Sequence, residues 1–345
     1  ENQYVWQPNT RGIPIAHLTE EMTQAGPGWV NGLPNNKPGD RPWNYHPMFV
    51  SLFRNKKSFT LDIRQPDGIE ILGRLAAISD VVIENSAVGT MEKLGIEYEW
   101  LCSMREDIIF VRAPGYGLSG EYKSARTMGS HLEGVVGHHL LRGYRDSGPK
   151  ENSAIFAADY IAATQIAFSV MAALWHREKT GKGQFIEMAQ AENSMAMFAQ
   201  AYMDFALNGN LGGALGNRSI YAADGEAPCG VYPCYSEGSA SEGLDRWIAI
   251  TITTDEEWIS LRQQMGNPDW AVSSDFESAK GRADSQDVLD KNIAEWTKQF
   301  SDYDLFHKLQ AAGIAAAPVL EASRVRDDPY VQHRELFSPQ TLEDD

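Results

Sequence analysis

Two short apolar runs separated by a helical pattern constrain the fold of this chain more than any other feature. Residues 80–85 and 108–113 have the length and the β-branched composition of buried strands. Helical spacing covers residues 69–78, and a second helix is predicted from Thr90 onward. Alternating residues at 58–63 predict a further strand ahead of them. This order of strands and helices predicts a parallel sheet with helices on both faces.

Polar and glycine-rich residues follow both buried runs. Glu84 and Asn85 close the first run, and Gly115-Tyr116-Gly117 comes shortly after the second. Ligands of parallel sheets bind beyond the carboxyl ends of the strands. The sequence therefore predicts a binding site formed by these two strand ends.

A different pattern begins after about residue 210. Residues 229–234 and 247–252 predict a pair of antiparallel strands. Helical patterns follow them at residues 255–265, 286–299 and 302–312. We interpret this region as a second, smaller α+β domain.

The two patterns divide the chain of 345 residues into domains. A chain of this length has room for two hydrophobic cores. We expect a large α/β domain over residues 1–215 and a small α+β domain over residues 216–316. Pro318-Val319-Leu320 is predicted to lead residues 317–345 back to the large domain.

Charge and composition exclude several classes of protein. The formal net charge of −17 argues against general binding to nucleic acid or anionic membranes. The three cysteines are too few for a disulfide framework and too isolated for a zinc site, so we expect free thiols and no metal. The most apolar segment, residues 155–175, contains a carboxylate and neutral polar side chains and predicts a core helix, with no membrane span. We therefore expect a soluble cytoplasmic protein.

Asp159 is the most informative single residue. It stands before a long apolar helix predicted over residues 161–175, and a basic, glycine-punctuated turn follows at residues 176–184. Asp often caps a helix because its oxygens accept hydrogen bonds from the first free backbone N–H groups. A carboxylate in the same place can also act as a nucleophile that becomes acylated. The residues alone leave both interpretations open.

Seven short segments, taken in order, carry a resemblance to a known family. They span nearly the whole chain, at residues 55–62, 80–85, 89–95, 115–120, 159–184, 216–218 and 313–320. In these segments the chain resembles the class III coenzyme A (CoA) transferases, which include formyl-CoA transferase and carnitine CoA-transferase. The α-methylacyl-CoA racemases are related and share the fold. Members of the family begin with a β-α-β unit that this chain lacks before Glu1, so we expect a fragment of a longer polypeptide.

The resemblance implies a fold and an activity. It implies a Rossmann-like large domain, an interlinked homodimer, and transfer of CoA from an acyl-CoA to a carboxylic acid acceptor. A CoA thioester is then the substrate, and no cofactor is bound permanently. Asp159 would attack the thioester to give an anhydride, which the CoA thiolate converts into an aspartyl-CoA thioester. Hydrogen-bond donors at the helix start are expected to hold the pKa of Asp159 down.

The resemblance also implies residues that contact CoA. Lys56, Lys57 and Arg126 match positions where the family places basic residues near CoA, and Asn85 matches a polar contact. The chain carries Ser86 after Asn85, where the family has an aromatic residue followed by Arg. That departure puts the family's adenine contact in doubt.

A second departure surrounds residues 128–134. Gly129 stands where many relatives carry an acid, and His131 and Glu133 lie about one helical turn further on. These two residues are candidates for a substrate pocket particular to this subfamily, and an ordinary helix surface is the alternative interpretation of both.

Two alternatives to CoA transfer follow from the same resemblance. A racemase needs two acid–base groups on opposite faces of the α-carbon. The histidine of the racemase relatives would fall at Met128, which cannot shuttle protons, and this favours transfer. The other alternative is an inactive acyl-CoA binding protein, and the presence of Asp159 argues against it.

Overall fold

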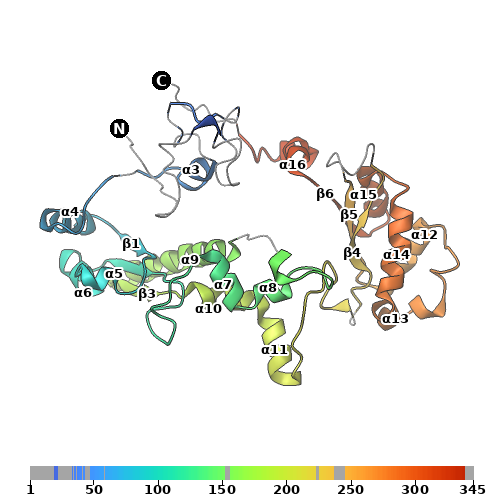
Figure 1. The fold of residues 1–345 in the computed structure, drawn as a ribbon, viewed down its shortest axis with the longest axis horizontal. Helices are drawn as coiled ribbons and strands as arrows, with labels where there is room; N and C mark the ends of the chain where they lie inside the picture. Colours follow the sequence, from blue (N-terminus) through green and yellow to red (C-terminus); the bar gives the residue numbers. More distant parts are fainter. Residues whose placement is uncertain are drawn as a thin grey trace. The chain divides into compact units, whose positions relative to one another are not determined.

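The computed structural model describes residues 19–21, 33, 35, 37–40, 42, 47–57, 59–151, 156–222, 225–236 and 245–338. It divides into two compact units (Figure 1). One unit comprises residues 1–72 and 334–345, and the other comprises residues 73–333. The first unit contains α3 (Pro47–Leu52), and the first residues of α4 (Pro66–Ala77) also belong to it. The candidate site described below is built from residues of the second unit.

A three-stranded parallel sheet forms the base of the site. Its strands are β1 (Val81–Glu84), β2 (Ile109–Arg112) and β3 (Gln184–Glu187), in the order β1-β2-β3. Val81 is in register with Ile109, which is in register with Gln184. Every residue of the central strand β2 is buried, as expected for a strand with neighbours on both edges and helices on both faces. The predicted parallel pairing of β1 and β2 is confirmed.

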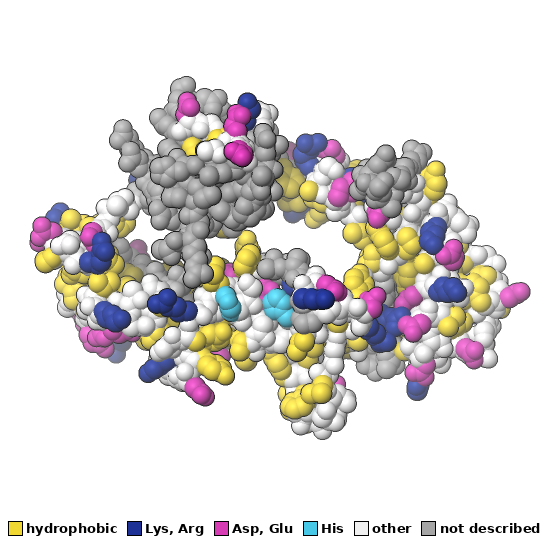
Figure 2. Space-filling model, in the orientation of Figure 1, with side chains coloured by type: hydrophobic (Ala, Val, Ile, Leu, Met, Phe, Trp, Pro, Cys, Tyr) yellow, Lys and Arg dark blue, Asp and Glu magenta, His cyan; other side chains and the backbone are white. Residues whose placement is uncertain are grey.

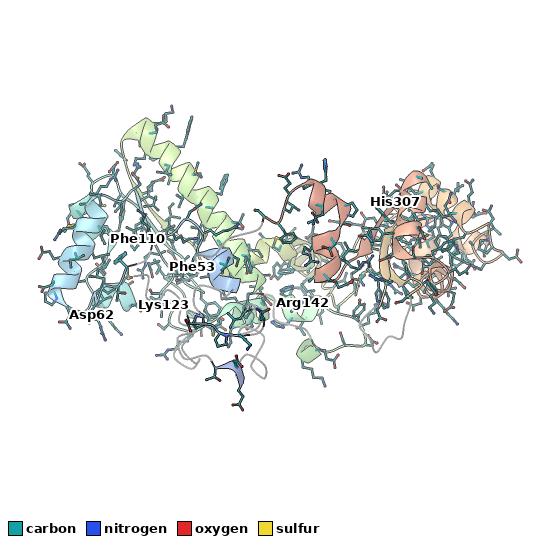
Figure 3. All side chains as sticks on the ribbon, turned by 90° about the horizontal axis from the view of Figure 1, so that it is seen from above. Phe53, Asp62, Phe110, Lys123, Arg142 and His307 are labelled. Atoms are coloured by element: carbon teal, nitrogen blue, oxygen red, sulfur yellow. The ribbon has the colours of Figure 1, made fainter. Side chains whose placement is uncertain are left out.

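Helices cover both faces of this sheet. On one face, α6 (Tyr98–Met104) and the end of α4 (Pro66–Ala77) pack against Phe110 through Leu101 and Ala76. The long helix α9 (Ala157–Thr180) covers the other face, where Ala173 packs against Ile109 and Val111. Figure 3 labels Phe110 in this layered part of the molecule. The alternation of side chains along β2 therefore supplies one apolar surface to each layer.

Helix α9 packs one face on the sheet and leaves most of its surface exposed. Its inner face packs on the sheet through Ile166 and Val170, and its C-terminal turn is fixed where Arg177 donates to the Asp80 carboxylate at 2.8 Å. By length and composition α9 is apolar enough to cross a membrane, which the sequence analysis did not expect. A single helix of this kind is weak support for a membrane span, and the core helix of a globular protein has the same composition.

Shorter helices pack around the start of α9. Leu132 and Val136 of the α7 region pack with Ala158 of α9 and Ala191 of α10. The other α-helices of the residues described in this part are α5 (Thr90–Lys93), α7 (Gly129–Val135), α8 (His138–Leu141), α10 (Gln190–Met195) and α11 (Ala199–Asn208). This cluster, with the sheet, sets the position of Asp159.

A separate antiparallel sheet follows. Its strands β4 (Cys229–Pro233), β5 (Trp247–Thr251) and β6 (Ala315–Val319) lie in the order β4-β5-β6. Among the described residues, the α-helices that accompany it are α12 (Asp255–Gln264), α13 (Ala279–Asp284), α14 (Gln286–Thr297) and α15 (Asp302–Ala311). Trp258, Leu261 and Leu289 are fully buried in the core between them. The two predicted antiparallel strands and the three predicted helices are confirmed.

The segment expected to lead back to the large domain forms part of this sheet. Strand β6 pairs with β5 as far as Val319, which is in register with Trp247. The antiparallel sheet therefore extends past residue 316, and the helices α16 (Ala322–Asp327) and α17 (Pro329–His333) follow it. The division into domains at residues 215 and 316 stays a prediction.

The strand expected at residues 58–63 is wrong for the described residues 59–63, and residue 58 lies outside them. Asp62 instead closes a local turn, accepting from the backbone N–H of Arg64 at 3.1 Å and from its guanidinium at 2.8 Å. Such local side-chain bonds compete with a strand when no neighbouring strand is available.

Candidate functional site

A cavity of about 410 Å³ lies at the carboxyl ends of the parallel strands. Asn85 follows β1, Tyr116 follows β2 and Gln190 follows β3, and all three line the cavity with Asp159 and Arg126. The volume falls within the range of small-molecule sites. The sequence predicted a site at these strand ends, and the structure places Asn85, Arg126 and Asp159 around one cavity.

Asp159 is the third residue of α9 and does not cap it. The residue that precedes the helix is Phe156, in the left-handed conformation at a φ of 53°, and no side chain of its own caps the first turn. The backbone N–H of Ala157 donates to Oε1 of Glu133 at 2.6 Å instead. Helix capping therefore does not explain why an acid stands at position 159.

The pKa of Asp159 is raised above its ordinary value. Desolvation by the surrounding protein is the main cause, and repulsion by the Glu133 carboxylate adds to it, while a hydrogen bond from its own backbone N–H opposes them. The carboxyl group is open to solvent from the cavity, yet protein atoms crowd it on the other sides. The expectation that donors at the helix start hold this pKa down is wrong, because burial outweighs the one backbone donor.

Gly129 makes room for the Asp159 carboxyl group. A Cβ atom built on Gly129 would lie 2.2 Å from Oδ2 of Asp159 and 2.7 Å from Cδ1 of Phe156. Both distances are far below van der Waals contact, so α7 approaches the start of α9 closely only because residue 129 has no side chain. The glycine noted as a departure from the family pattern is required by the position of Asp159.

Two cations, Lys123 and Arg126, stand on the cavity wall. Both are exposed, and among the described residues neither forms an ion pair within 4 Å. Unpaired cations in a cavity suit an anionic ligand, since phosphates and carboxylates pair with them by charge-assisted hydrogen bonds. Asn85 adds a neutral amide to the same wall.

A buried arginine holds the loop between β1 and α5. Arg112, at the end of β2, is 5% exposed; it donates from Nε to Glu84 and from Nη1 to Glu92 at 2.6 Å. The other oxygen of Glu84 accepts from the backbone N–H of Ser86 at 2.7 Å. Hydrogen bonding from Arg112 lowers the pKa of Glu92. This network was not expected from the sequence, although an arginine inside an apolar strand was its visible signal.

Gln190 was also missed. It is 9% exposed, lines the cavity, and donates from Nε2 to the carbonyl oxygen of Ala113 at 2.7 Å. It follows β3, of which the sequence pattern had included only Gln184, as the end of the turn at residues 176–184. Recognising β3 as a third parallel strand would have placed Gln190 at the same edge of the sheet.

The other predicted site residues lie elsewhere. Nδ1 of His131 accepts from the backbone N–H of Met128 at 3.1 Å and so completes the first turn of α7. Glu133 is 1% exposed and turns toward the start of α9. Neither residue lines the cavity, so their predicted substrate contacts stay untested predictions. Lys56 and Lys57 belong to the other unit, and their contact with CoA also stays a prediction.

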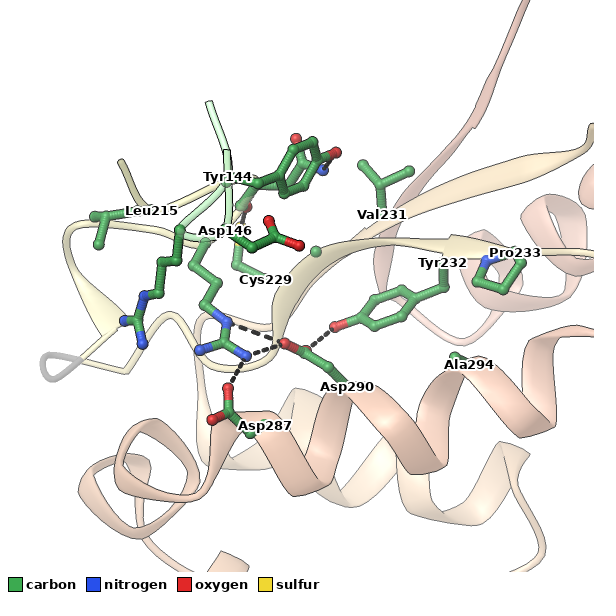
Figure 4. Close-up of a pocket in the computed structure, with 15 residues that line it drawn as sticks. Tyr144, Asp146, Leu215, Cys229, Val231, Tyr232, Pro233, Asp287, Asp290 and Ala294 are labelled. Atoms are coloured by element: carbon green, nitrogen blue, oxygen red, sulfur yellow. Dashed lines mark hydrogen bonds and ion pairs between the residues drawn. The ribbon is translucent and has the colours of Figure 1, made fainter. Parts of the chain in front are cut away.

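A second cavity, of about 500 Å³, lies beside the antiparallel sheet (Figure 4). Its wall includes Arg218, which donates to Asp290 at 2.7 Å and also pairs with Asp287. The hydroxyl group of Tyr232 donates to the other oxygen of Asp290 at 2.8 Å. The charges at the centre of this cavity therefore satisfy one another, in contrast to Asp159.

Comparisons with known proteins identify the family. Residues 33–344 match the family model described as CoA-transferase family III. The chain is 30% identical over 279 residues to succinyl-CoA–D-citramalate CoA-transferase of Chloroflexus aurantiacus, covering 81% of this chain and 66% of that protein. It is 27% identical to succinyl-CoA:mesaconate CoA-transferase of Haloarcula hispanica, covering 85% of this chain and 71% of the relative.

Solved structures agree with this. A CAIB/BAIF family protein from Brucella suis superposes with a TM-score of 0.71 at 28% identity, covering 83% of this chain and 72% of that one. The chain thus spans about two thirds of the length of the curated relatives it matches. Since the family model matches most of its length, the chain belongs to CoA-transferase family III.

Proposed function

We propose that this protein transfers CoA from an acyl-CoA to a carboxylic acid, with Asp159 as the nucleophile. The observation that supports the proposal best is the Asp159 carboxyl group in a cavity at the ends of the parallel strands. The carboxylate has no ion-pair partner among the described residues, so its oxygens are available to attack when it is ionised, and its raised pKa makes that ionised form more basic. Arg126 and Lys123 supply the positive charge that an anionic substrate needs.

The reaction then proceeds in two matched halves. An oxygen of Asp159 attacks the thioester carbonyl carbon, and the C–S bond breaks with its electron pair leaving on sulfur. The CoA thiolate attacks the carbonyl carbon of Asp159 in the resulting anhydride, forms a new C–S bond, and releases the donor acid as a carboxylate. The acceptor carboxylate repeats these steps in reverse and regenerates Asp159. No net hydrolysis occurs, so the site must keep water from the two activated carbonyl groups.

The relatives suggest the class of substrate. The Chloroflexus and Haloarcula proteins are named for succinyl-CoA as donor and for D-citramalate and mesaconate as acceptors. A relative from Agrobacterium fabrum is named succinate–glutarate CoA-transferase. We infer a short dicarboxylic acid as acceptor and succinyl-CoA as donor. The unpaired cations Lys123 and Arg126 support this, because a dicarboxylate retains one charge after the other carboxyl group becomes a thioester.

Racemisation has no support from the cavity. Met128 lines the wall at the position where the racemase relatives carry a histidine, and its thioether cannot exchange protons. Racemisation would also need an acid–base group opposite Asp159. An assay for α-proton exchange in deuterated water separates this alternative from CoA transfer.

The direct test follows CoA between acids. The protein is mixed with succinyl-CoA and isotopically labelled citramalate, mesaconate or glutarate, and labelled acyl-CoA is measured by mass spectrometry. We expect label in the thioester pool and an adduct of CoA on Asp159. Binding of succinyl-CoA without exchange to any acid would support the inactive binding protein instead.

We also propose that the protein forms a homodimer. Tyr160, Phe168, Met171 and Trp175 form a stripe on the outer face of α9 and are all more than half exposed. Hydrophobic side chains are also exposed on α11, the projecting helix at the bottom of Figure 2. A helix that is apolar all round is normally buried, and a second copy would cover it. Sedimentation of the full-length protein as a stable monomer would contradict this proposal.

A further inference from the structure

Glu133 is a buried acid that the proposed mechanism does not use. Its side chain is 1% exposed and belongs to α7, the helix that packs against the start of α9. Oε1 accepts the backbone N–H of Ala157, the first residue of α9, at 2.6 Å. Asp159 lies two residues further along the same helical turn. The Glu133 carboxylate is therefore fixed beside the proposed nucleophile.

Basic groups surround the second oxygen of Glu133 without bonding closely to it. Nδ1 of His138, Nε2 of His139 and Nη1 of Arg142 lie 3.8, 3.7 and 3.8 Å from Oε2. These distances are too long for hydrogen bonds. Burial, with the positive charge of Arg142 next, lowers the pKa of His138, so this imidazole is mainly neutral near pH 7. The permanent charge facing Glu133 is Arg142.

Asp159 has no such compensation. Among the described residues no cation lies within 4 Å of its carboxyl group, and its charged neighbour is the acid Glu133. Two carboxylates near one another disfavour the state in which both are ionised. This repulsion disappears when the Asp159 carboxylate becomes uncharged, either by binding a proton or by forming a covalent bond.

We propose that Glu133 is a positioning residue whose negative charge favours conversion of the Asp159 carboxylate into its uncharged CoA thioester. The inference rests on the proposed function. In that half-reaction the donor C–S bond breaks, a C–S bond to the carbonyl carbon of Asp159 forms, and the negative charge leaves with the carboxylate product. An oxygen that began on Asp159 departs in that product. Glu133 therefore opposes the reactant state and has no charge to repel in the thioester.

The proposal predicts that the pKa of Asp159 and the fraction of enzyme present as the Asp159-CoA thioester change together. Protonation and thioester formation remove the same charge from the same side chain. Removing the repulsion should therefore lower the pKa of Asp159 and reduce the thioester fraction in proportion. A change of one unit in the pKa of Asp159 corresponds to about a tenfold change in the ratio of thioester to free enzyme.

The first experiment uses Glu133→Gln. The amide oxygen can still accept from Ala157, and the side chain keeps its shape, so mainly the charge is lost. The acid limb of the kcat/KM profile for succinyl-CoA is expected to move down by about 0.5 to 1 pH unit. The ratio of Asp159-CoA thioester to free enzyme, measured by intact mass at a fixed ratio of succinyl-CoA to succinate, is expected to fall about 3- to 10-fold.

The opposite change comes from Arg142→Gln. This variant removes the permanent positive charge that faces Glu133, so the acid limb should move up and the thioester ratio should rise. It also keeps the inference testable if Glu133→Gln fails to fold, because Arg142 lies outside the cavity and its loss leaves the contact with Ala157 in place. Opposite shifts from two neighbouring residues would not follow from general loosening of the fold.

The matched control is Asp302→Asn. Asp302 is also a buried carboxylate, 3% exposed, and it pairs with Arg324 at 2.6 Å in the antiparallel part of the chain. We expect this variant to lose stability while the acid limb and the thioester ratio stay at their wild-type values. An identical response to Asp302→Asn and Glu133→Gln would overturn the inference.

The outcomes separate this inference from the proposed function. A wild-type protein that forms no thioester with succinyl-CoA or any other acyl-CoA contradicts the mechanism through Asp159. A wild-type protein that forms it, with neither measurement altered in folded Glu133→Gln, overturns the role of Glu133 alone. The role of Glu133 is also overturned if the acid limb of the kcat/KM profile and the thioester ratio change in unequal proportion, because a single electrostatic cause must change both.

Discussion

The two cavities of this protein differ in how their central charges are balanced. Beside the antiparallel sheet, Arg218 is bonded to Asp287 and Asp290, and Tyr232 bonds to Asp290 as well. At the ends of the parallel strands, Asp159 stands without a cation within 4 Å among the described residues, and its pKa is raised. The first cavity is larger, about 500 Å³ against about 410 Å³. Under the proposed function it is the unbalanced carboxylate, and not the larger volume, that marks the reacting site.

The strongest test of this contrast removes the nucleophile. Asp159→Asn is expected to reduce CoA exchange by about 10³-fold or more, because an amide cannot form the acyl intermediate. Hydroxylamine trapping with succinyl-CoA should label Asp159 in the wild type and nothing in the variant. The matched change is Asp290→Asn in the larger cavity, which should leave exchange per folded molecule unaltered. Wild-type exchange by Asp159→Asn would place the nucleophile elsewhere.

The next test removes a cation from each cavity. Arg126→Ala should raise KM for succinyl-CoA about 10-fold, the loss of about 1.4 kcal/mol of charge-assisted binding, with a smaller change in kcat. The effect should shrink at high salt, because Arg126 is exposed. An unchanged KM at low ionic strength would show that Arg126 does not contact the substrate.

Arg218→Met should have the opposite signature. Among the described residues it leaves Asp290 with the Tyr232 hydroxyl as its hydrogen-bond partner, so the free energy of unfolding should fall by about 1 to 3 kcal/mol. Urea denaturation measures this loss, and exchange activity per folded molecule should stay unchanged. Lost activity with intact stability would mean that the larger cavity takes part in the reaction.

The smallest expected effect concerns stability and pH. The folded-state pKa of Asp159 is raised, so between its unfolded and folded pKa values the folded protein binds more protons than the unfolded chain. This group's contribution to stability therefore falls as pH rises through that window. Asp159→Asn should melt slightly higher than wild type at pH 7, and the difference should diminish toward pH 4. A lower melting temperature for the variant at pH 7 would contradict the raised pKa.

The sequence predicted the central elements of the fold because their patterns are local. β1 and β2 are short continuous apolar runs, as buried parallel strands require. β3 was missed because residues 184–187 alternate between half-buried and exposed positions at the edge of the sheet. The expected strand at residues 58–63 failed for a related reason, since alternation makes a strand only where a neighbour pairs with it.

Some residues of the candidate site could likewise be predicted from the sequence, and others could not. Asn85, Arg126 and Asp159 were expected from the resemblance, and they line one cavity. Gln190, Gly129 and the Arg112 network were not expected as parts of a site, because each depends on a contact between segments distant in the chain. A glycine is recognisable as necessary only once the atom that would clash with its side chain is known.

The sequence by itself determined the strand and helix order around β1 and β2, the family, and the presence of an acid at the start of α9. Tertiary structure decided how that acid behaves. Burial at the cavity wall and the approach of Glu133 from α7 raise the pKa of Asp159, against the expectation from the helix start alone. The physical reason is that charge energetics depend on distance and solvent access in three dimensions, and neither is written in local sequence.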